Sequence, residues 1–473
     1  MKKLFVLILL LNFQMGLATD PVKIELPERA KIEGTYSVTI EKNKSLHLII
    51  AKDRNNKQYI IKPLIRLPDG SLKYFDLVEL ELLPEILSHH MNGQKIILTG
   101  HNYKKKELYI IEINAVDGTN TVRAIQDQKQ PNFVLRTDDE TFLVRRKGNA
   151  RSLFVQRIRT SEDEELIQID VPKEKISQFK RVVESLGSEI NQNEYVHKGS
   201  ISESKVYLQD EKLIFTKDNI QSYSAWAMTA ELDVETPLTF LGIKGSSLEK
   251  PKDYNTYYLD GRMFSVIADK TDLLFSTYDL ELKTELNAIS LKNDLADKYD
   301  QTPEFLKRLA KGKMRPTVAI NKTKDGNYLV EINQVDKTVY YYNYDWWWHH
   351  NWMFNDFFWQ QHNQHVQDVI NNLPSVPRFT PSPDMYEGLD ALYAKAIDFE
   401  SIKFVVDRDG NLLTNSSQET VFQYIDKDEF LDPFKEDNKK LNFTASFTDT
   451  TMSYIYQDKK SKDVFVSFQS ILE

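Results

Sequence analysis

Short runs of alternating apolar and polar residues recur along the chain, and the clearest lies within residues 315–344. There, residues 317–320, 328–332 and 338–342 are rich in β-branched and aromatic side chains, and residues 324–327 (Lys-Asp-Gly-Asn) separate the first two runs. Such side chains suit a pleated, half-buried surface, and Asp-Gly supplies the positive φ of a tight hairpin turn. This stretch therefore predicts three consecutive antiparallel strands.

Comparable pairs of strands recur through the rest of the chain. Eight hairpins are predicted, at 45–65, 95–113, 141–157, 205–216, 263–278, 317–332, 402–414 and 443–456. They are spaced mostly about 45–65 residues apart, and most are followed by a further extended segment. A repeat of this length with three or four strands per unit is typical of a β-propeller. We predict an all-β fold, a β-propeller of about seven or eight blades with a few helical insertions.

One alternative, tandem β-sandwich domains, fits the same strands. The chain has only 16 glycines, fewer than blade turns usually require, and it has no Trp-Asp blade signature. In a propeller, we expect the last strand, 463–469, to pair with an N-terminal strand such as 35–41, because this pairing removes two open sheet edges. The predicted helices are 173–186, 303–311 and 385–396, placed by their caps and apolar faces.

The N-terminus has the pattern of a cleavable secretory signal. Two lysines, Lys2 and Lys3, precede an apolar run over residues 4–11, and the small residues Gly16 and Ala18 follow. This run is shorter than the about 20 residues that span a bilayer, and no later segment reaches about 18 consecutive apolar residues. We predict a signal peptide over residues 1–18, a propeller-like domain over 19–473, and no transmembrane helix after cleavage. The protein is then exported to the periplasm, the outer cell surface or the medium.

Composition excludes several functional classes. The net charge of −9 gives no electrostatic basis for nucleic-acid binding. The chain has no cysteine, which excludes thiol catalysis, cysteine-ligated metals and disulfides. An exported protein without disulfides must depend on its core, and this favours a bacterial envelope protein. The repeated hairpins resemble exported β-propeller proteins of bacterial envelopes over residues 35–473, a resemblance of class that assigns no functional residue.

The most distinctive segment is an aromatic and histidine-rich insertion, residues 345–383. Residues 346–365 contain five of the six tryptophans and four of the nine histidines. From residue 355 onward the pattern predicts a helix, followed by an extended proline-rich exit. The candidate binding residues are the large rings of this insertion: Trp346, Trp347, Trp348, Trp352, Phe354, Phe358 and Trp359.

Four interpretations of this insertion compete. It can fold back as a plug with its own small core, since a large exposed apolar patch favours association. It can hold a protein partner, because aromatic residues are enriched in interface hot spots. It can make peripheral contact with a membrane interface, where tryptophan is favoured, although few lysines and arginines accompany it. It can bind a metal through His349, His350, His362 and His365, although these histidines match no established ligand spacing.

Other candidate chemistry is sparse. His89 and His90 are expected to lie in a surface loop, with a metal site as the alternative, and Asp407–Asn411 is expected to be a hairpin turn that only resembles a calcium loop. We find no nucleophile-elbow or phosphate-loop motif, and we predict no cofactor. The sequence favours a non-enzymatic binding or scaffold protein that holds a partner on a propeller face and through the insertion. The alternative is a secreted glycan-binding or glycan-hydrolysing propeller with carboxylates in its channel.

Overall fold

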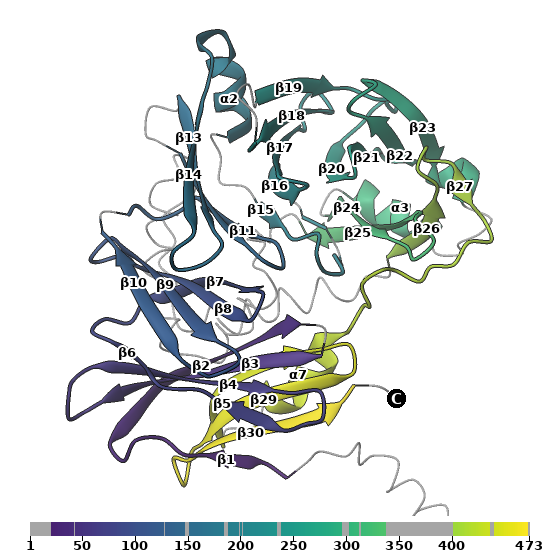
Figure 1. The fold of residues 1–473 in the computed structure, drawn as a ribbon. Coiled ribbons are helices and arrows are strands. Elements are labelled where there is room, and N and C mark those ends of the chain that lie inside the picture. Colours follow the sequence, from purple (N-terminus) through teal and green to yellow (C-terminus); the bar gives the residue numbers. More distant parts are fainter. Residues whose placement is uncertain are drawn as a thin grey trace, which may run out of the picture.

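The computed structural model describes residues 20–336 and 401–471, apart from short gaps at 42, 127, 147–150, 184–187, 198, 201, 234–237, 296–301, 312–313 and 436–438. These residues are nearly all β-structure, and they form seven sheets of four or five strands (Figure 1). The predicted all-β propeller architecture is confirmed. We number the sheets 1 to 7 in chain order.

Sheets 1 to 3 follow each other directly and are built from antiparallel neighbours joined by short turns. Sheet 1 contains β2 (Ala30–Glu41), β3 (Lys44–Asp53), β4 (Tyr59–Arg66), β5 (Leu72–Tyr74) and β6 (Val78–Leu80). Sheet 2 contains β7 (Glu85–Asn92), β8 (Lys95–Asn102), β9 (Glu107–Asn114) and β10 (Asn120–Ile125). Sheet 3 contains β11 (Phe133–Arg136), β12 (Thr141–Arg146), β13 (Ser152–Ile158) and β14 (Glu164–Asp170).

Sheets 4 to 6 repeat this order, with one additional strand in sheet 4. Sheet 4 contains β15 (Ser188–Ile190), β16 (Ser204–Gln209), β17 (Lys212–Asn219), β18 (Ser224–Glu231) and β19 (Leu238–Ile243), and β15 pairs parallel to β16. Sheet 5 contains β20 (Asp253–Leu259), β21 (Arg262–Ala268), β22 (Leu273–Asp279) and β23 (Thr284–Ser290). Sheet 6 contains β24 (Met314–Lys322), β25 (Tyr328–Asp336), β26 (Ile402–Val406) and β27 (Leu412–Leu413). Two predicted hairpins, 317–332 and 402–414, thus belong to one sheet, which explains why eight hairpins give seven sheets.

Sheet 7 joins the two ends of the described chain. It contains β28 (Lys440–Phe447), β29 (Thr451–Asp458), β30 (Val464–Ser470) and, at its outer edge, β1 (Val22–Ile24). The last strand does pair with an N-terminal strand, but the partner is β1, which pairs Ile24 with Val464, and the suggestion of residues 35–41 was wrong. Those residues lie in β2 and contact sheet 7 through side chains instead, as when Thr35 Oγ1 lies 3.0 Å from Thr444 Oγ1.

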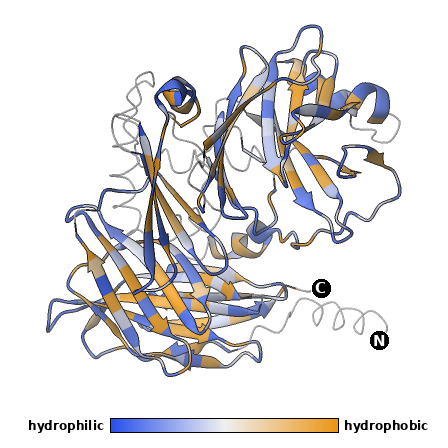
Figure 2. Cartoon of the chain, turned by 45° about the horizontal axis from the view of Figure 1, so that its top comes forward, coloured by the Kyte–Doolittle hydropathy of each residue, from blue (hydrophilic) through white to orange (hydrophobic). Residues whose placement is uncertain are grey.

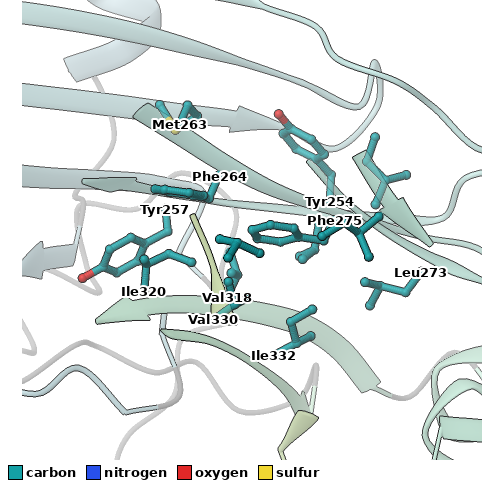
Figure 3. Close-up of a cluster of buried hydrophobic side chains, with 14 of the residues drawn as sticks. Tyr254, Tyr257, Met263, Phe264, Leu273, Phe275, Val318, Ile320, Val330 and Ile332 are labelled. Carbon is teal, nitrogen blue, oxygen red and sulfur yellow. The ribbon is translucent and has the colours of Figure 1, made fainter. Parts of the chain in front are cut away.

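Neighbouring sheets share apolar cores, and most inner strands are buried on both faces. Sheets 4, 5 and 6 share the largest apolar cluster, in which Phe264 and Phe275 of sheet 5 point toward Val318 and Val330 of sheet 6 (Figure 3). Smaller clusters join sheets 1 and 2, sheets 2 and 3, sheets 3 and 4, and sheets 7 and 1. Figure 2 shows the apolar segments concentrated in the strands and the polar ones in the turns. Burial on both faces explains the nearly continuous apolar runs of the inner strands.

The junction between sheets 6 and 7 is built differently. Within the described residues, no apolar cluster joins these two sheets. Helix α7 (Lys427–Lys435) packs instead on sheet 7, where the ring of Phe434 stacks 4.7 Å from that of Phe443. The chain between β27 and α7 therefore connects two sheets that share no apolar cluster within the described residues.

Two of the predicted helices lie within the described residues, close to where the sequence predicts them. The predicted helix 173–186 is a 3₁₀ turn, η1 (Lys173–Lys175), followed by α2 (Ile176–Val183), which buries Phe179 against sheets 3 and 4. The predicted helix 303–311 is α3 (Thr302–Ala310), preceded by a π-helical turn, η2 (Leu291–Leu295). The predicted strand 338–342 and helix 385–396 lie outside the described residues.

Candidate functional site

The aromatic insertion falls within residues 337–400, outside the described residues. All the predicted binding residues (Trp346, Trp347, Trp348, Trp352, Phe354, Phe358 and Trp359) and the weak metal candidates (His349, His350, His362 and His365) lie there, so their roles stay predictions. The structure describes the two strands that the insertion connects, β25 and β26, which pair with each other in sheet 6. The base of the insertion is therefore the part of this site that can be built from coordinates.

A buried carboxylate lies at this base. Glu331 in β25 is fully buried (0 %), and its Oε1 lies 2.6 Å from His197 Nδ1. Its Oε2 accepts a hydrogen bond from Tyr195 Oη at 3.0 Å and lies 3.3 Å from Lys403 Nζ. We call Tyr195, His197, Glu331, Lys403 and Tyr424 the Glu331 cluster. It brings together three segments that are far apart in the sequence.

The strand register places Glu331 on one face of sheet 6. Glu331 pairs with Ala319 of β24 on one side and with Lys403 of β26 on the other. Its neighbours Val330 and Ile332 point the opposite way, into the core shared with sheet 5, because successive side chains alternate across a strand. The small side chain of Ala319 leaves room for the groups that surround Glu331.

The residues between β15 and β16 reach across sheets 5 and 6 to form the second part of the cluster. Asn321 in β24 holds Val196 by two hydrogen bonds, from Val196 N to Oδ1 at 2.8 Å and from Nδ2 to Val196 O at 2.9 Å. Asn255 of sheet 5 donates to Ser200 O at 2.8 Å. Gly199 has φ of +65°, and a Cβ there would clash with the carbonyl oxygen of Val318, so only glycine allows this close approach.

The neighbouring groups favour the ionised form of the Glu331 carboxylate. Burial alone would raise the pKa of Glu331, but the contact with His197, the charge of Lys403 and the hydrogen bond from Tyr195 outweigh it and hold the pKa below its usual range. Burial and the nearby Glu331 carboxylate raise the pKa of Tyr195, so that its hydroxyl remains a donor. Glu331 is therefore a charged anchor that ties the β15–β16 segment and β26 to β25.

An exposed aromatic surface adjoins the cluster. The ring of Tyr424 lies 4.8 Å from that of His197 and 5.2 Å from that of Tyr195, and Lys403 Nζ lies 5.6 Å above it. Tyr424 is 41 % exposed, and Val421 (51 %) and Phe422 (38 %) are exposed beside it in the sequence. We call residues 421–424 the 421–424 strip. Tyr424 is the residue of this strip that contacts the other members of the Glu331 cluster.

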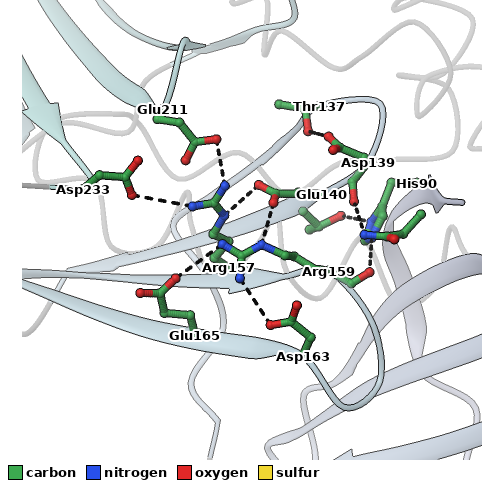
Figure 4. Close-up of polar contacts among 12 residues, drawn as sticks. His90, Thr137, Asp139, Glu140, Arg157, Arg159, Asp163, Glu165, Glu211 and Asp233 are labelled. Atoms are coloured by element: carbon green, nitrogen blue, oxygen red, sulfur yellow. Dashed lines mark hydrogen bonds and ion pairs between the residues drawn. The ribbon is translucent and has the colours of Figure 1, made fainter.

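A second charged network fastens sheet 3 to sheet 4 (Figure 4). The Glu140 carboxylate accepts from Arg157 Nε and Arg159 Nε, both at 2.7 Å. Arg157 Nη2 also donates to Glu211 at 2.7 Å, across to the β16–β17 turn, and its Nη1 lies 3.7 Å from Asp233. Each arginine thus serves several carboxylates, as expected of a structural network rather than a catalytic pair.

The prediction that His89 and His90 lie in a surface loop was wrong. Both belong to β7 and are buried, with exposures of 6 % and 3 %. His89 Nδ1 contacts Tyr36 Oη at 3.1 Å, and His90 Nδ1 contacts Thr141 Oγ1 at 3.0 Å. Their partners lie on neighbouring sheets, which is why the local sequence gave no sign of burial. By contrast, Asp407 accepts from Asp409 N and Asn411 N at 2.9 and 2.8 Å, which confirms the hairpin turn.

The described residues offer little for hydrolytic or metal chemistry. Among them, no group of three or more His, Asp and Glu side chains is placed to hold a metal ion. Burial raises the pKa of Glu85 to about 7 despite a hydrogen bond from Tyr103, the direction expected of a general acid. However, Glu85 is only 4 % exposed, so it cannot touch a polymeric glycan. No helix in the described part of the chain is long and apolar enough to cross a bilayer.

Comparisons with known proteins assign this chain to no family. No family model and no curated protein matches it. Among solved structures, the β-propeller domain of the Trilobed protease from Pyrococcus furiosus matches at 9 % identity over 95 % of this chain and 97 % of that one, with a TM-score of 0.33. An uncharacterized protein from Listeria monocytogenes matches at 8 % identity over 67 % and 83 %, with a TM-score of 0.31. These scores are low, and we draw no functional conclusion from them.

Sequence reasoning missed the Glu331 cluster. Its members Tyr195 and Glu331 are 136 residues apart, and nothing in either local pattern pairs them. One signal was present, because Glu331 is the single charged residue of the otherwise apolar run 328–332. A buried charge must be paired, so its position predicted a partner without identifying it.

Proposed function

We propose that this protein is an exported, non-enzymatic binding or scaffold protein that holds a protein partner at the surface formed by the aromatic insertion and the 421–424 strip. The observation that carries the proposal is the Glu331 cluster. It ties β25 and β26, between which the insertion lies, to the β15–β16 segment through a fully buried carboxylate. A rigid base of this kind suits a recognition element, because pre-organisation lowers the entropic cost of binding.

The chemistry of the strip favours a protein as the occupant. Val421, Phe422 and Tyr424 expose three large apolar side chains within four residues, and the sequence places five tryptophans in the adjoining insertion. Aromatic anchors beside a polar rim are typical of protein interface cores, and Lys403 and His197 supply that rim. The partner expected here presents an apolar patch edged by acceptor groups.

The cellular setting of the proposal comes from the sequence. The signal-like residues 1–18, the absence of cysteine and the acidic net charge fit export to a bacterial envelope. Glu140 and Glu331 are engaged in structural ion pairs, and Glu85 is deeply buried. This engagement favours binding over hydrolysis.

Substitutions on each half of the surface test the proposal. Full-length protein is used to recover partners from an envelope fraction, and W346A/W347A/W352A and F422S are compared with wild type. Both variants are expected to lose at least about tenfold of the bound partner while the melting temperature stays within a few degrees, because hot-spot residues carry most of the affinity. The matched control is L166S, which changes an exposed apolar residue (64 %) on sheet 3 and should leave recovery unchanged.

Three outcomes contradict the proposal. Equal losses for L166S and F422S would indicate non-specific adhesion. Loss of folding in the tryptophan variant would indicate that the rings form a plug. Binding of F422S-sensitive glycans on an array, with no protein recovered, would replace the protein partner by a carbohydrate, for which Tyr424 would be the stacking platform.

A further inference from the structure

Four of the five described histidines are buried in one arc of the propeller, sheets 7, 1, 2 and 3. His47 lies in β3, His89 and His90 in β7, and His101 in β8. The fifth, His197, contacts the Glu331 carboxylate.

His89 joins three sheets through one imidazole. Its Nε2 lies 2.5 Å from Arg136 Nη1 of sheet 3, and its Nδ1 lies 3.1 Å from Tyr36 Oη of sheet 1. Since a guanidinium can only donate, Nε2 must be the acceptor and the proton must reside on Nδ1. Protonation of Nε2 would remove the acceptor and place two cations in direct contact.

His47 occupies the seam at which sheet 7 meets sheet 1. Its Nδ1 lies 2.7 Å from Ser37 Oγ of β2, and its Nε2 lies 2.7 Å from Ser453 Oγ of β29. Ser37 Oγ continues to Thr444 Oγ1 at 2.8 Å, which extends this hydroxyl network along the seam. The imidazole is fully buried, and its two nitrogens contact hydroxyl groups and no carboxylate.

The charged groups around both histidines act in the same direction. Burial and the Arg66 charge lower the pKa of His47 to about 3. Burial, Arg136 and His90 lower the pKa of His89, and only a hydrogen bond to the Thr39 backbone opposes them. His90 has acidic neighbours, Asp139 and Glu140, which partly offset its burial. His47 and His89 are therefore the two positions at which a proton costs most.

We propose that His47 and His89 make the seams of sheets 7, 1, 2 and 3 acid-sensitive, so that mild acid opens this arc while sheets 4, 5 and 6 remain closed. A proton from the medium binds the imidazole nitrogen that accepts a hydrogen bond in the closed form. The seam then opens so that water can solvate the charge. Among the described residues, the histidine that contacts sheets 4 to 6 is His197, and it faces the Glu331 carboxylate instead of a guanidinium or a hydroxyl pair.

The expected size follows from linkage. An exposed histidine has a pKa of about 6.5. Lowering the pH from about 7.5 to about 5.0 therefore raises the ratio of open to closed seam about 30-fold for each such histidine. Ordinary carboxylates titrate below this window, near about 4. Glu85 works in the opposite direction, since its pKa of about 7 means that the folded form takes up a proton first.

Hydrogen exchange of the full-length protein tests the proposal peptide by peptide. At about pH 5.0 against about pH 7.5, after correction for intrinsic exchange, amides of β2, β11 and β29 should open about 30-fold more, and amides of β21 and β25 should change less than about threefold. Strand β7 is left out of this comparison because it also carries Glu85, whose raised pKa opposes the effect of His89. H47Q should suppress the increase at β29 and H89Q the increase at β11, and each should reduce it at β2, which both histidines contact, because an amide side chain can accept without titrating.

Either of two results overturns the proposal. A uniform increase in all seven sheets would show global acid unfolding, and an unchanged arc would show that the seams tolerate the proton. If a glutamine variant fails to fold, the comparison of the two sectors within wild-type protein still decides between these outcomes.

Discussion

Sheets 4 to 6 and sheets 7, 1, 2 and 3 are built on one strand plan but are held together by different chemistry. The first sector shares one apolar cluster rich in aromatic rings, in which Phe264 packs 5.3 Å from Tyr328 and Phe275 packs 5.4 Å from Phe404. The second sector has smaller apolar clusters, and hydroxyls, histidines and arginines complete its seams. The repeat thus determines the backbone geometry of every sheet, whereas the side chains at each interface determine how that interface responds to mutation and pH.

The largest expected effect is in the apolar sector. Phe264→Ala should lower the free energy of unfolding by about 3–5 kcal/mol, because it removes a fully buried ring and leaves a cavity between sheets 5 and 6. Urea unfolding measures this loss. Leu282→Ala, at an exposed position (68 %) in the same sheet region, is the control and should change it by less than about 0.5 kcal/mol. Equal effects would show that the shared cluster is not the main source of stability.

The charged network of sheets 3 and 4 should rank second. Arg157→Met leaves the buried Glu140 with Arg159 as its remaining cationic partner among those described, and we expect a loss of about 2–4 kcal/mol. Arg123→Met breaks a comparable 2.6 Å ion pair to Glu164 whose arginine is exposed, so its loss should stay below about 1 kcal/mol. Equilibrium unfolding in urea compares the two. Similar losses would contradict the structural role of the buried network.

The polar seams should make the stability of the protein depend on pH. The folded state depresses the pKa of His47 to about 3, so between about pH 3 and 6.5 the unfolded state binds more protons and stability falls as the pH falls. From about pH 7.5 to 5.0, His47 should account for about 2 kcal/mol of this loss. H47Q should remove that share from the pH profile of urea midpoints. An identical profile in H47Q would contradict the assignment.

The smallest effect is expected at the base of the insertion. Glu331→Gln keeps the shape of the side chain but removes the charge that His197 and Lys403 face, and we expect a loss of about 1–2 kcal/mol. The amides of β26 should exchange faster, while those of β21 should not. Lys324→Gln, which ends an exposed ion pair with Glu419, is the control and should have almost no effect.

Much of the fold could be predicted from the sequence because alternation and turn chemistry are local. The Lys324–Asn327 turn forms as predicted, with Gly326 at φ of +83°. Strand β1 was missed as the closing strand because it is three residues long with a single buried side chain, Ile24. The placement of β26 and β27 in sheet 6 was missed because the insertion separates them from β25.

The candidate site was less predictable for a different reason. Its aromatic insertion is evident from composition, but the groups that hold its base meet only in three dimensions. Glu331 pairs with Tyr195 and His197 from the β15–β16 segment and with Lys403 from β26. The burial of His89 and His90 depends likewise on Tyr36, Arg136 and Thr141 of adjacent sheets, which no local pattern encodes.

Photo-crosslinking at the 421–424 strip tests the central functional claim most directly. Phe422 is replaced by p-benzoylphenylalanine in the full-length protein, Leu166 is replaced in the same way as the control, and both are irradiated in the envelope fraction. The account predicts one discrete adduct with another protein at position 422 and none at position 166. An adduct confined to the chain itself, or the same adducts at both positions, would contradict a partner-binding surface at the base of the insertion.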